Sequence, residues 1–219
     1  MKKILNKRLE MVSAFIHDNE NVIDVGCDHG LLGIYLILNR KNIRVISSDI
    51  KEGPILKAKE NILKYHLEDK IELKLGNGLE PITDDITTVV ISGMGGINMV
   101  NILKSINNYP KVKKLVLSPN NDFEFLRKNI SKIGYMINNE KMIDEKGKYY
   151  LIIEAIKGKK RVRSFFGKLN LRDKVVKQYY KDLYNQNKKI LNNLSLFNKI
   201  KKIKMIYQNL LIRVLIKNK

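Results

Sequence analysis

Cysteine, histidine and long apolar runs are all scarce in this chain of 219 residues. Because Cys27 is the single cysteine, no disulfide can form within the chain, and we expect a protein of the reducing cytoplasm. No apolar run approaches the roughly 20 residues that cross a bilayer, and early charged residues interrupt any signal peptide. His17 and His66 stand apart from any cluster of cysteines or carboxylates, so we expect no metal site.

Acidic residues are nearly absent from the end of the chain. Residues 1–156 hold 23 lysines and arginines against 20 acids, whereas residues 157–219 hold 19 against only Asp173 and Asp182, a net charge of +17. A general enrichment in lysine would give both parts of the chain a similar excess of positive charge. The asymmetry therefore predicts a phosphate-backbone partner, with a membrane surface or an acidic protein as alternatives.

Strand-like and helical segments alternate through most of the chain. Short apolar runs predict strands at residues 21–25, 44–48, 71–75, 86–92 and 114–118. Helical spacing is found at residues 5–16, 31–39, 54–65, 97–106 and 123–133. Residues 135–142 and 149–156 flank a turn-forming segment and predict a β-hairpin. We therefore expect an α/β protein with a mostly parallel, doubly wound sheet and an antiparallel edge. This arrangement resembles the Rossmann-like, seven-stranded sheet of class I methyltransferases.

A basic connector at residues 158–167 marks the expected domain boundary, between a sheet domain at 1–157 and a second domain at 168–219. Apolar spacings of mostly three and four predict two long helices there, joined near residues 192–195 as an antiparallel, coiled-coil hairpin. The expected packing stripes are Val176, Tyr179, Leu183, Ile190 and Leu194 on the first helix, and Phe197, Ile200, Ile203, Tyr207, Leu210 and Val214 on the second.

The turn after the first predicted strand, Asp24-Val25-Gly26-Cys27-Asp28-His29-Gly30, carries the strongest signal for a ligand. Open α/β sheets bind ligands at the carboxyl ends of their strands, and Gly26 and Gly30 permit a tight turn. The turn lacks the third glycine that a dinucleotide pyrophosphate needs, whereas a carboxylate here suits S-adenosylmethionine, which has no phosphate. A purely structural strand-to-helix turn is the alternative.

Two further strand ends offer contacts for an adenosine cofactor. Asp49 ends the second strand and can accept both ribose hydroxyls, although an exposed Asp at a strand end is common. Gly76-Asn77-Gly78 follows the third strand, and the side-chain carbonyl of Asn77 can accept from an adenine amino group. A plain turn explains this segment equally well.

The fourth and fifth strands end in candidate walls for a reacting group. Gly93-Met94-Gly95-Gly96 would form a flat backbone surface beside the methyl group of a bound S-adenosylmethionine. The alternative is a flexible turn in which Met94 is an ordinary core residue. Pro119 and Asn120 form a second candidate wall. The Asn/Asp-Pro-Pro-aromatic motif of many exocyclic-amine methyltransferases is missing here.

Five motifs in this order resemble the bacterial TrmK family, whose members methylate N1 of adenine 22 in the D-loop region of tRNA. They are Gly26-Cys27-Asp28-His29-Gly30, Gly53-Pro54, Gly76-Asn77-Gly78-Leu79, Ser92-Gly93-Met94-Gly95-Gly96 and Ser118-Pro119-Asn120. The resemblance covers essentially the whole chain. Two positions depart from it: Asn77 stands where the family usually has Asp, and Gly33 where a Pro is often found.

The resemblance implies S-adenosylmethionine as cofactor, tRNA as partner and a methyltransferase domain at residues 1–157. The cofactor-binding candidates are Asp24, Gly26, Cys27, Asp28, His29, Gly30, Asp49, Asn77, Gly78, Gly93, Met94 and Gly95. The substrate-binding candidates are Gly96, Pro119, Asn120, Lys188, Lys189, Lys199, Lys201 and Lys202. We expect a monomer without membrane association. The alternatives are a methyltransferase for another RNA position, a small molecule or a protein, and a non-catalytic RNA-binding module.

The implied reaction needs alignment rather than a strong base, because adenine N1 has an in-plane lone pair. The product purine is positive, and Asp28 is the catalytic candidate for stabilising it, unless this residue only contacts the cofactor. His29 either shuttles a proton or orders the turn. A paired adenine must first be extruded, so the tRNA backbone needs a firm hold. The lysines of the helical hairpin would supply it, unless they form a solvated helix face.

Overall fold

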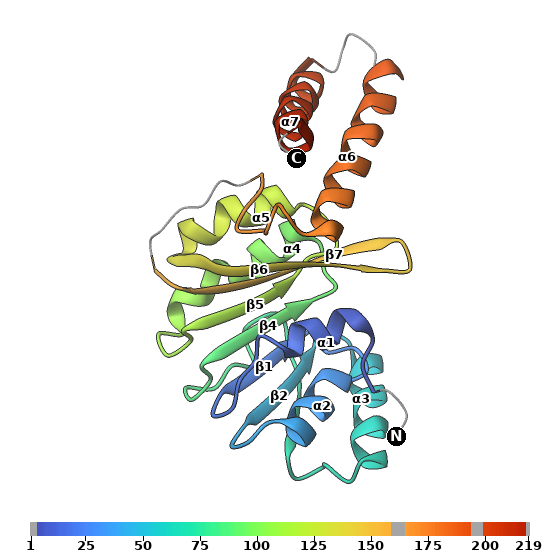
Figure 1. The fold of residues 1–219 in the computed structure, drawn as a ribbon. Helices are drawn as coiled ribbons and strands as arrows, with labels where there is room; N and C mark the ends of the chain where they lie inside the picture. Colours follow the sequence, from blue (N-terminus) through green and yellow to red (C-terminus); the bar gives the residue numbers. More distant parts are fainter. Residues whose placement is uncertain (1–3, 159–164, 194–198, 218–219) are drawn as a thin grey trace. The chain divides into compact units, whose positions relative to one another are not determined.

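A computed structural model describes residues 4–158, 165–193 and 199–217. Within them, seven strands form one sheet in the order β3-β2-β1-β4-β5-β7-β6 (Figure 1). The strands are β1 Asn21–Val25, β2 Arg44–Asp49, β3 Ile71–Leu75, β4 Thr88–Ser92, β5 Lys114–Ser118, β6 Tyr135–Glu145 and β7 Lys148–Lys157. Strands β1 to β5 pair in parallel, and β7 pairs antiparallel with β5. The predicted fold class and the antiparallel edge are confirmed.

Helices cover both faces of the sheet. They are α1 Lys7–Ser13, α2 Leu31–Asn39, α3 Glu52–Lys64, α4 Gly96–Ile102 and α5 Phe123–Ile130, with 3₁₀ helices η1 Leu103–Asn108 and η2 Ser131–Ile133. The strand order runs one way from β1 to β3 and the other way from β4 onward. Right-handed crossovers therefore place α2 and α3 on one face and α4 and α5 on the opposite face (Figure 1).

Two predicted boundaries shift for local reasons. The strand predicted at 86–92 begins at Thr88, because the N–H of Ile86 donates to the carbonyl of Thr83 in a turn. The helix predicted at 97–106 is α-helical only through Ile102 and continues as η1. Leu103 and Ile106 are both buried, and their spacing of three suits a helix with three residues per turn.

The central strands are buried on both faces, which is why they read as continuous apolar runs. Ile23 of β1, Val89 of β4 and Leu115 of β5 have no exposed surface. Parallel strands enclosed by helices on both sides have this character. The turns at their carboxyl ends are thus supported by a closely packed core.

The chain divides into two compact units. The sheet unit comprises Met1–Lys141 and Tyr150–Lys168. The helical unit comprises Met142–Tyr149, which is the tip of the β6–β7 hairpin, and Leu169–Lys219. Two separate segments of the chain therefore contribute to each unit.

A buried ion pair holds residues 165–168 on the sheet unit. Nε of Arg127 donates to Glu140 at 2.7 Å, and the two side chains are only 2% and 0% exposed. Nη1 of Arg127 also donates to the carbonyl of Phe165 at 2.8 Å, and Glu140 accepts from the backbone N–H of Lys168. The described end of the predicted connector thus packs as part of the sheet unit, while residues 159–164 lie outside the described residues.

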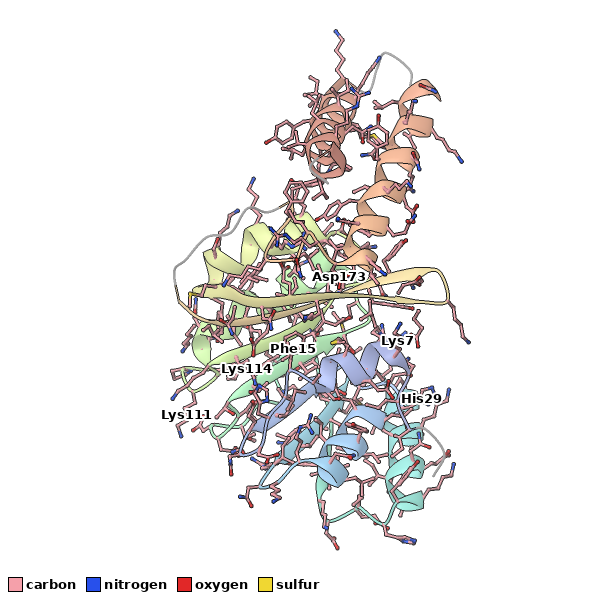
Figure 2. All side chains as sticks on the ribbon, viewed as in Figure 1. Lys7, Phe15, His29, Lys111, Lys114 and Asp173 are labelled. Atoms are coloured by element: carbon pink, nitrogen blue, oxygen red, sulfur yellow. The ribbon has the colours of Figure 1, made fainter. Side chains whose placement is uncertain are left out.

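The helical unit contains two antiparallel helices, α6 Lys174–Asn193 and α7 Lys199–Lys217. Asp173, labelled in Figure 2, caps α6 by accepting from the N–H of Val175 at 2.8 Å. Asn187 donates to Asn209 at 3.1 Å, and Arg213, further along α7, donates to Tyr184, earlier in α6. The predicted pair of helices is present, while residues 194 and 195 of their predicted junction, together with Phe197, lie outside the described residues.

The predicted packing stripe of α7 is wrong. Five of its residues face solvent, at 54–86% exposure: Ile200, Ile203, Tyr207, Leu210 and Val214. The buried residues are Met205 and Ile212 instead. This helix carries apolar residues on two faces, and the polar partners that Asn187 and Tyr184 offer on α6 select the face that contains Gln208, Asn209 and Arg213.

Candidate active site

The predicted ligand turn at residues 24–30 lies at the end of β1 and forms part of the wall of a cavity. The N–H of Gly26 donates to the carbonyl of Ser48 at 2.8 Å, which fixes the turn to the end of β2. Gly26, Asp28 and Gly30 have φ angles of +76°, +51° and +66°. Glycine adopts this left-handed region without strain, and Asp tolerates it better than most residues.

The loops after β4 and β5 meet this turn at the same edge of the sheet. The Cε methyl of Met94 lies 2.3 Å from where a Cβ on Gly26 would stand, so a side chain there would displace this methyl group, and the positive φ of Gly26 would strain it as well. The N–H of Asn120 donates to the carbonyl of Met94 at 2.8 Å, and its side-chain amide donates to the carbonyl of Gly93. The predicted floor at Gly93–Gly96 and the predicted wall at Pro119 and Asn120 therefore lie side by side.

A cavity of about 300 Å³ opens at the carboxyl ends of β1, β2 and β3. Five of the predicted cofactor residues line it: Gly26, Asp49, Asn77, Gly78 and Met94. The other lining residues, which were not predicted from the sequence, are Val25, Ile50, Gly76, Asn98, Asn101 and Ile102. Asn98 and Asn101 lie three residues apart on α4, directly after the glycine floor. That spacing, which places both amides on one helix face, is the signal that could have found them.

The loops after β2 and β3 position the polar groups of this cavity. The carboxylate of Asp49 accepts from the N–H of Lys51 at 3.0 Å, which orients it at the end of β2. The N–H of Asn77 donates to the carboxylate of Glu80 at 3.0 Å. The loop after β3, which has Asn77 in place of the Asp that the family usually has, is therefore fixed by the carboxylate of Glu80 within the same loop.

Asp24 is buried at the end of β1, with only 4% of its surface exposed. Burial, followed by the negative charge of Asp49, raises the pKa of Asp24 to about 7, against a smaller opposing effect of the Arg8 cation. A carboxyl group that is half ionised near neutral pH, next to a ligand cavity, is typical of a functional site. It favours a cationic ligand, whose charge would stabilise the ionised form.

The other chemical groups of the turn differ in their exposure. Cys27 is buried, and burial raises the pKa of its thiol, so the thiol is protonated and a poor nucleophile. The side chains of Asp28 and His29 are 72% and 47% exposed, with Oδ2 of Asp28 and Nε2 of His29 3.5 Å apart. The side chain of His29, labelled in Figure 2, lies at the surface of the sheet unit. Asp28 and His29 are thus accessible to a large substrate.

Arg8 and Tyr150, which no sequence motif indicates, also reach the carboxyl edge of the sheet. Nη1 of Arg8 lies 3.0 Å from where a Cβ on Gly93 would stand. The guanidinium carbon is 5.4 Å from the centroid of the Tyr150 ring. Arg8 precedes the first strand and Tyr150 belongs to β7, so neither lies in a strand-to-helix turn where a motif search would look.

The predicted tRNA-binding lysines belong to the helical unit. Lys188 and Lys189 are exposed near the end of α6, and Lys199, Lys201 and Lys202 lie in the first turn of α7. Of these, only Lys202 is half-buried. In residues 4–158, 165–193 and 199–217, no group of three or more His, Cys, Asp or Glu side chains could hold a metal ion. No helix in these ranges is long and apolar enough to cross a membrane.

Comparison with known proteins bears on this site. A family model described as a methyltransferase domain matches residues 5–153. The tRNA (adenine(22)-N(1))-methyltransferase of Bacillus subtilis is 33% identical over 156 residues, which are 70% of this chain and 66% of that enzyme. This alignment thus spans just under two thirds of the relative's length.

Two solved structures are similar over nearly their whole length. TrmK of M. capricolum in complex with S-adenosyl-homocysteine has a TM-score of 0.84 at 28% identity, covering 97% of each chain. A putative tRNA (m1A22) methyltransferase of Streptococcus pneumoniae in complex with S-adenosyl-L-methionine has a TM-score of 0.87 at 26% identity, covering 96% of this chain and 99% of that one.

The parallel sheet, the cavity at its carboxyl edge and the absent third glycine define a Rossmann-like protein of the methyltransferase class. Since the family model matches more than half of its residues, the chain belongs to the methyltransferase-domain family. The resemblance to the TrmK family, which five sequence motifs indicated, is confirmed by the relative and the two solved structures.

Proposed function

We propose that this chain is an S-adenosylmethionine-dependent enzyme that methylates N1 of adenine 22 in tRNA. The observation that carries the proposal is the cavity between Gly26, Asp49 and Asn77, in a chain similar throughout to structures solved with S-adenosyl-L-methionine or S-adenosyl-homocysteine. Adenine 22 is the position named for the Bacillus subtilis relative.

The residues of the cavity fit the proposed cofactor. About 300 Å³ suffices for a nucleoside with a short side chain, since small-molecule pockets begin near this volume. Asp49 offers a carboxylate to the ribose hydroxyls, and Asn77 and Asn101 offer amides to the adenine. The cofactor, when bound, supplies an electrophilic methyl group. Asp24 supplies the negative charge that would pair with the cationic end of the cofactor.

The chain's own residues align the adenine rather than deprotonate it. Gly93–Gly96 and the loop at Pro119 and Asn120 form a narrow, hydrogen-bonded platform on which a flipped base can lie. Asp28 stands exposed beside the turn, where its charge would stabilise the positive N1-methylated purine. His29 orders the turn, because its carbonyl accepts from the side chain of Asn61 at 2.9 Å.

The same proposal assigns different roles to the two parts of the chain. Residues 1–157 bind the cofactor, and the helical hairpin at 168–219 holds the tRNA backbone through Lys188, Lys189, Lys199, Lys201 and Lys202. The enzyme acts as a monomer in the cytoplasm.

Two measurements test the function. Titration calorimetry should detect binding of S-adenosylmethionine, and labelled methyl groups should be transferred to tRNA but not to a tRNA with guanine at position 22. Failure to bind the cofactor would refute an enzyme of this class. Equal labelling of the two tRNAs would refute the assigned position while leaving the enzyme class intact.

A further inference from the structure

One face of α7 presents a continuous line of apolar side chains to solvent. Five of them, which we call the α7 seam, are 54–86% exposed: Ile200, Ile203, Tyr207, Leu210 and Val214. Ile206, beside the seam, is 43% exposed. The large apolar side chains of α6 between residues 174 and 192 are instead buried or half-buried. Contiguous apolar surface of this kind on a folded protein marks an interaction site.

The seam is not used for packing within the helical unit. With 3.6 residues per turn, Met205 and Ile212 lie on the opposite side of α7, and both are buried. Asn187 of α6 donates to Gln208 and Asn209 near that buried side. Since α7 is already fixed to α6 through one side (Figure 1), its outer face is left for another molecule.

The spacing of the seam indicates what kind of surface fits it. Successive members are three, four, three and four residues apart, which is the spacing of the a and d positions in a coiled coil. A second helix can follow such a line over its whole length, because its own apolar side chains fit between those of the seam. Unpaired RNA bases are recognised chiefly by stacking on aromatic rings, whereas Ile200, Ile203 and Leu210 are aliphatic. The seam therefore fits an amphipathic helix.

The charges beside the seam distinguish between possible helices. The charged residues at the flanking heptad positions are Lys199, Lys204 and Arg213, and the sequence has no Asp or Glu after Asp182. Charges at these positions set partner choice in coiled coils, since opposite charges attract across the interface and like charges repel. A second copy of α7 would oppose cations with cations in either orientation. A helix with Asp or Glu beside its apolar positions would pair each cation with an acid.

We propose that the α7 seam is a docking site for an acidic, amphipathic helix of a partner protein. The inference goes beyond the proposed function and does not rest on it. Helical geometry places Lys201 and Lys202, assigned above to the tRNA backbone, away from the seam. The two partners thus use different sides of α7. A helix laid along so short a seam gives a small interface, so the complex is weak and reversible.

A short designed peptide tests the docking site. It carries Ile and Leu at its a and d positions and Glu at its e and g positions, and fluorescence anisotropy with the full chain should give a dissociation constant in the micromolar range. A second peptide with Lys in place of Glu should bind at least about tenfold more weakly, because it opposes the flanking cations. A scrambled peptide of the acidic composition, which lacks the heptad spacing, should also bind at least about tenfold more weakly.

Variants of the seam show where the peptide binds. Ile203→Gln combined with Leu210→Gln changes two exposed seam residues seven positions apart and should weaken binding of the acidic peptide at least about thirtyfold. Leu56→Gln combined with Leu63→Gln is the matched control, because these residues of α3 are also seven apart and are 60% and 45% exposed. This control should leave peptide binding unchanged. If the first double variant fails to fold, Tyr207→Gln alone makes the same comparison.

Four results would overturn the proposal. Equal binding of the acidic and the basic peptide would remove the charge selection, and equal losses in the two double variants would place the peptide elsewhere. A wild-type dimer in sedimentation that Ile203→Gln and Leu210→Gln dissociate would show that a second copy covers the seam. Binding of tRNA or of anionic lipid vesicles that depends on the seam, without binding of the acidic peptide, would assign this face to a different partner.

Discussion

The buried carboxyl of Asp24 should make the ligand-free protein less stable as the pH rises. Its pKa lies at about 7 instead of the ordinary 3.8, chiefly because burial penalises the charged form. A carboxyl whose pKa is raised by folding binds its proton more tightly in the folded state. The resulting penalty on folding is absent below about pH 4, increases between the two pKa values and is complete above about pH 8.

The magnitude follows from the size of the pKa change. One pKa unit corresponds to about 1.4 kcal/mol, so the fully ionised Asp24 lowers the free energy of unfolding by on the order of 4 kcal/mol. Between about pH 5 and about pH 8 the penalty grows by roughly 3 kcal/mol. Asp24→Asn removes the titration, so its stability relative to wild type should rise by that amount across this range.

Urea unfolding of both proteins, followed by circular dichroism at several pH values, measures this difference. Groups that titrate in both proteins cancel in the subtraction. Asp69→Asn, at an exposed position of the sheet unit, is the control and should give a flat difference. A flat curve for Asp24→Asn, or one that falls as the pH rises, would show that Asp24 is not an acid of raised pKa and would refute the electrostatic reasoning.

Two further predictions concern the connector and the helical unit. Gly167→Ala should lower the free energy of unfolding by about 3 kcal/mol or more, because its Cβ would stand 1.9 Å from Glu140 Oε2 and disrupt the buried pair with Arg127. The control Gly134→Ala, also at positive φ but in open surroundings, should lower it by only about 1 kcal/mol in the same urea titration. Equal losses for the two variants would contradict the role given to the ion pair. Replacing Lys188, Lys189 and Lys201 by Gln should weaken tRNA binding and reduce the slope of log affinity against log salt by about 2, without changing cofactor affinity. The same change at Lys57, Lys59 and Lys64 of α3 should leave the slope unaltered, and an identical response of the two triple variants would remove the helical unit from the tRNA interface.

The strands could be predicted because a strand that is buried on both faces is a continuous run of apolar residues in the sequence. Each central strand is a short apolar run that ends in glycine, Asp or Pro, and such runs have few other interpretations in an alternating chain. Gly33 shows the limit of reading by resemblance. A Cβ there would lie 2.8 Å from Oγ of Ser47, so in this chain the glycine allows α2 to approach β2 closely.

The packing face of α7 could not be predicted, because spacing identifies apolar faces and does not choose between two of them. Ile203 and Leu210 are as apolar as Met205 and Ile212, yet only the second pair is buried. The choice depends on Asn187, a buried polar residue of α6 whose amide needs acceptors. Gln208 and Asn209 of α7 provide them, so polar partners set the rotation of a helix that hydrophobicity leaves undetermined.

The same distinction explains which parts of the candidate site could be found. Gly26, Asp49 and Asn77 lie at or just after the ends of strands, and the fold alone brings strand ends together at one edge of a sheet. Arg8 reaches that edge from a helix that precedes the sheet, and its sequence context, an amphipathic helix, predicts only an exposed cation. What sets it apart is a property of the folded chain: its guanidinium lies close to Gly93 and faces the ring of Tyr150.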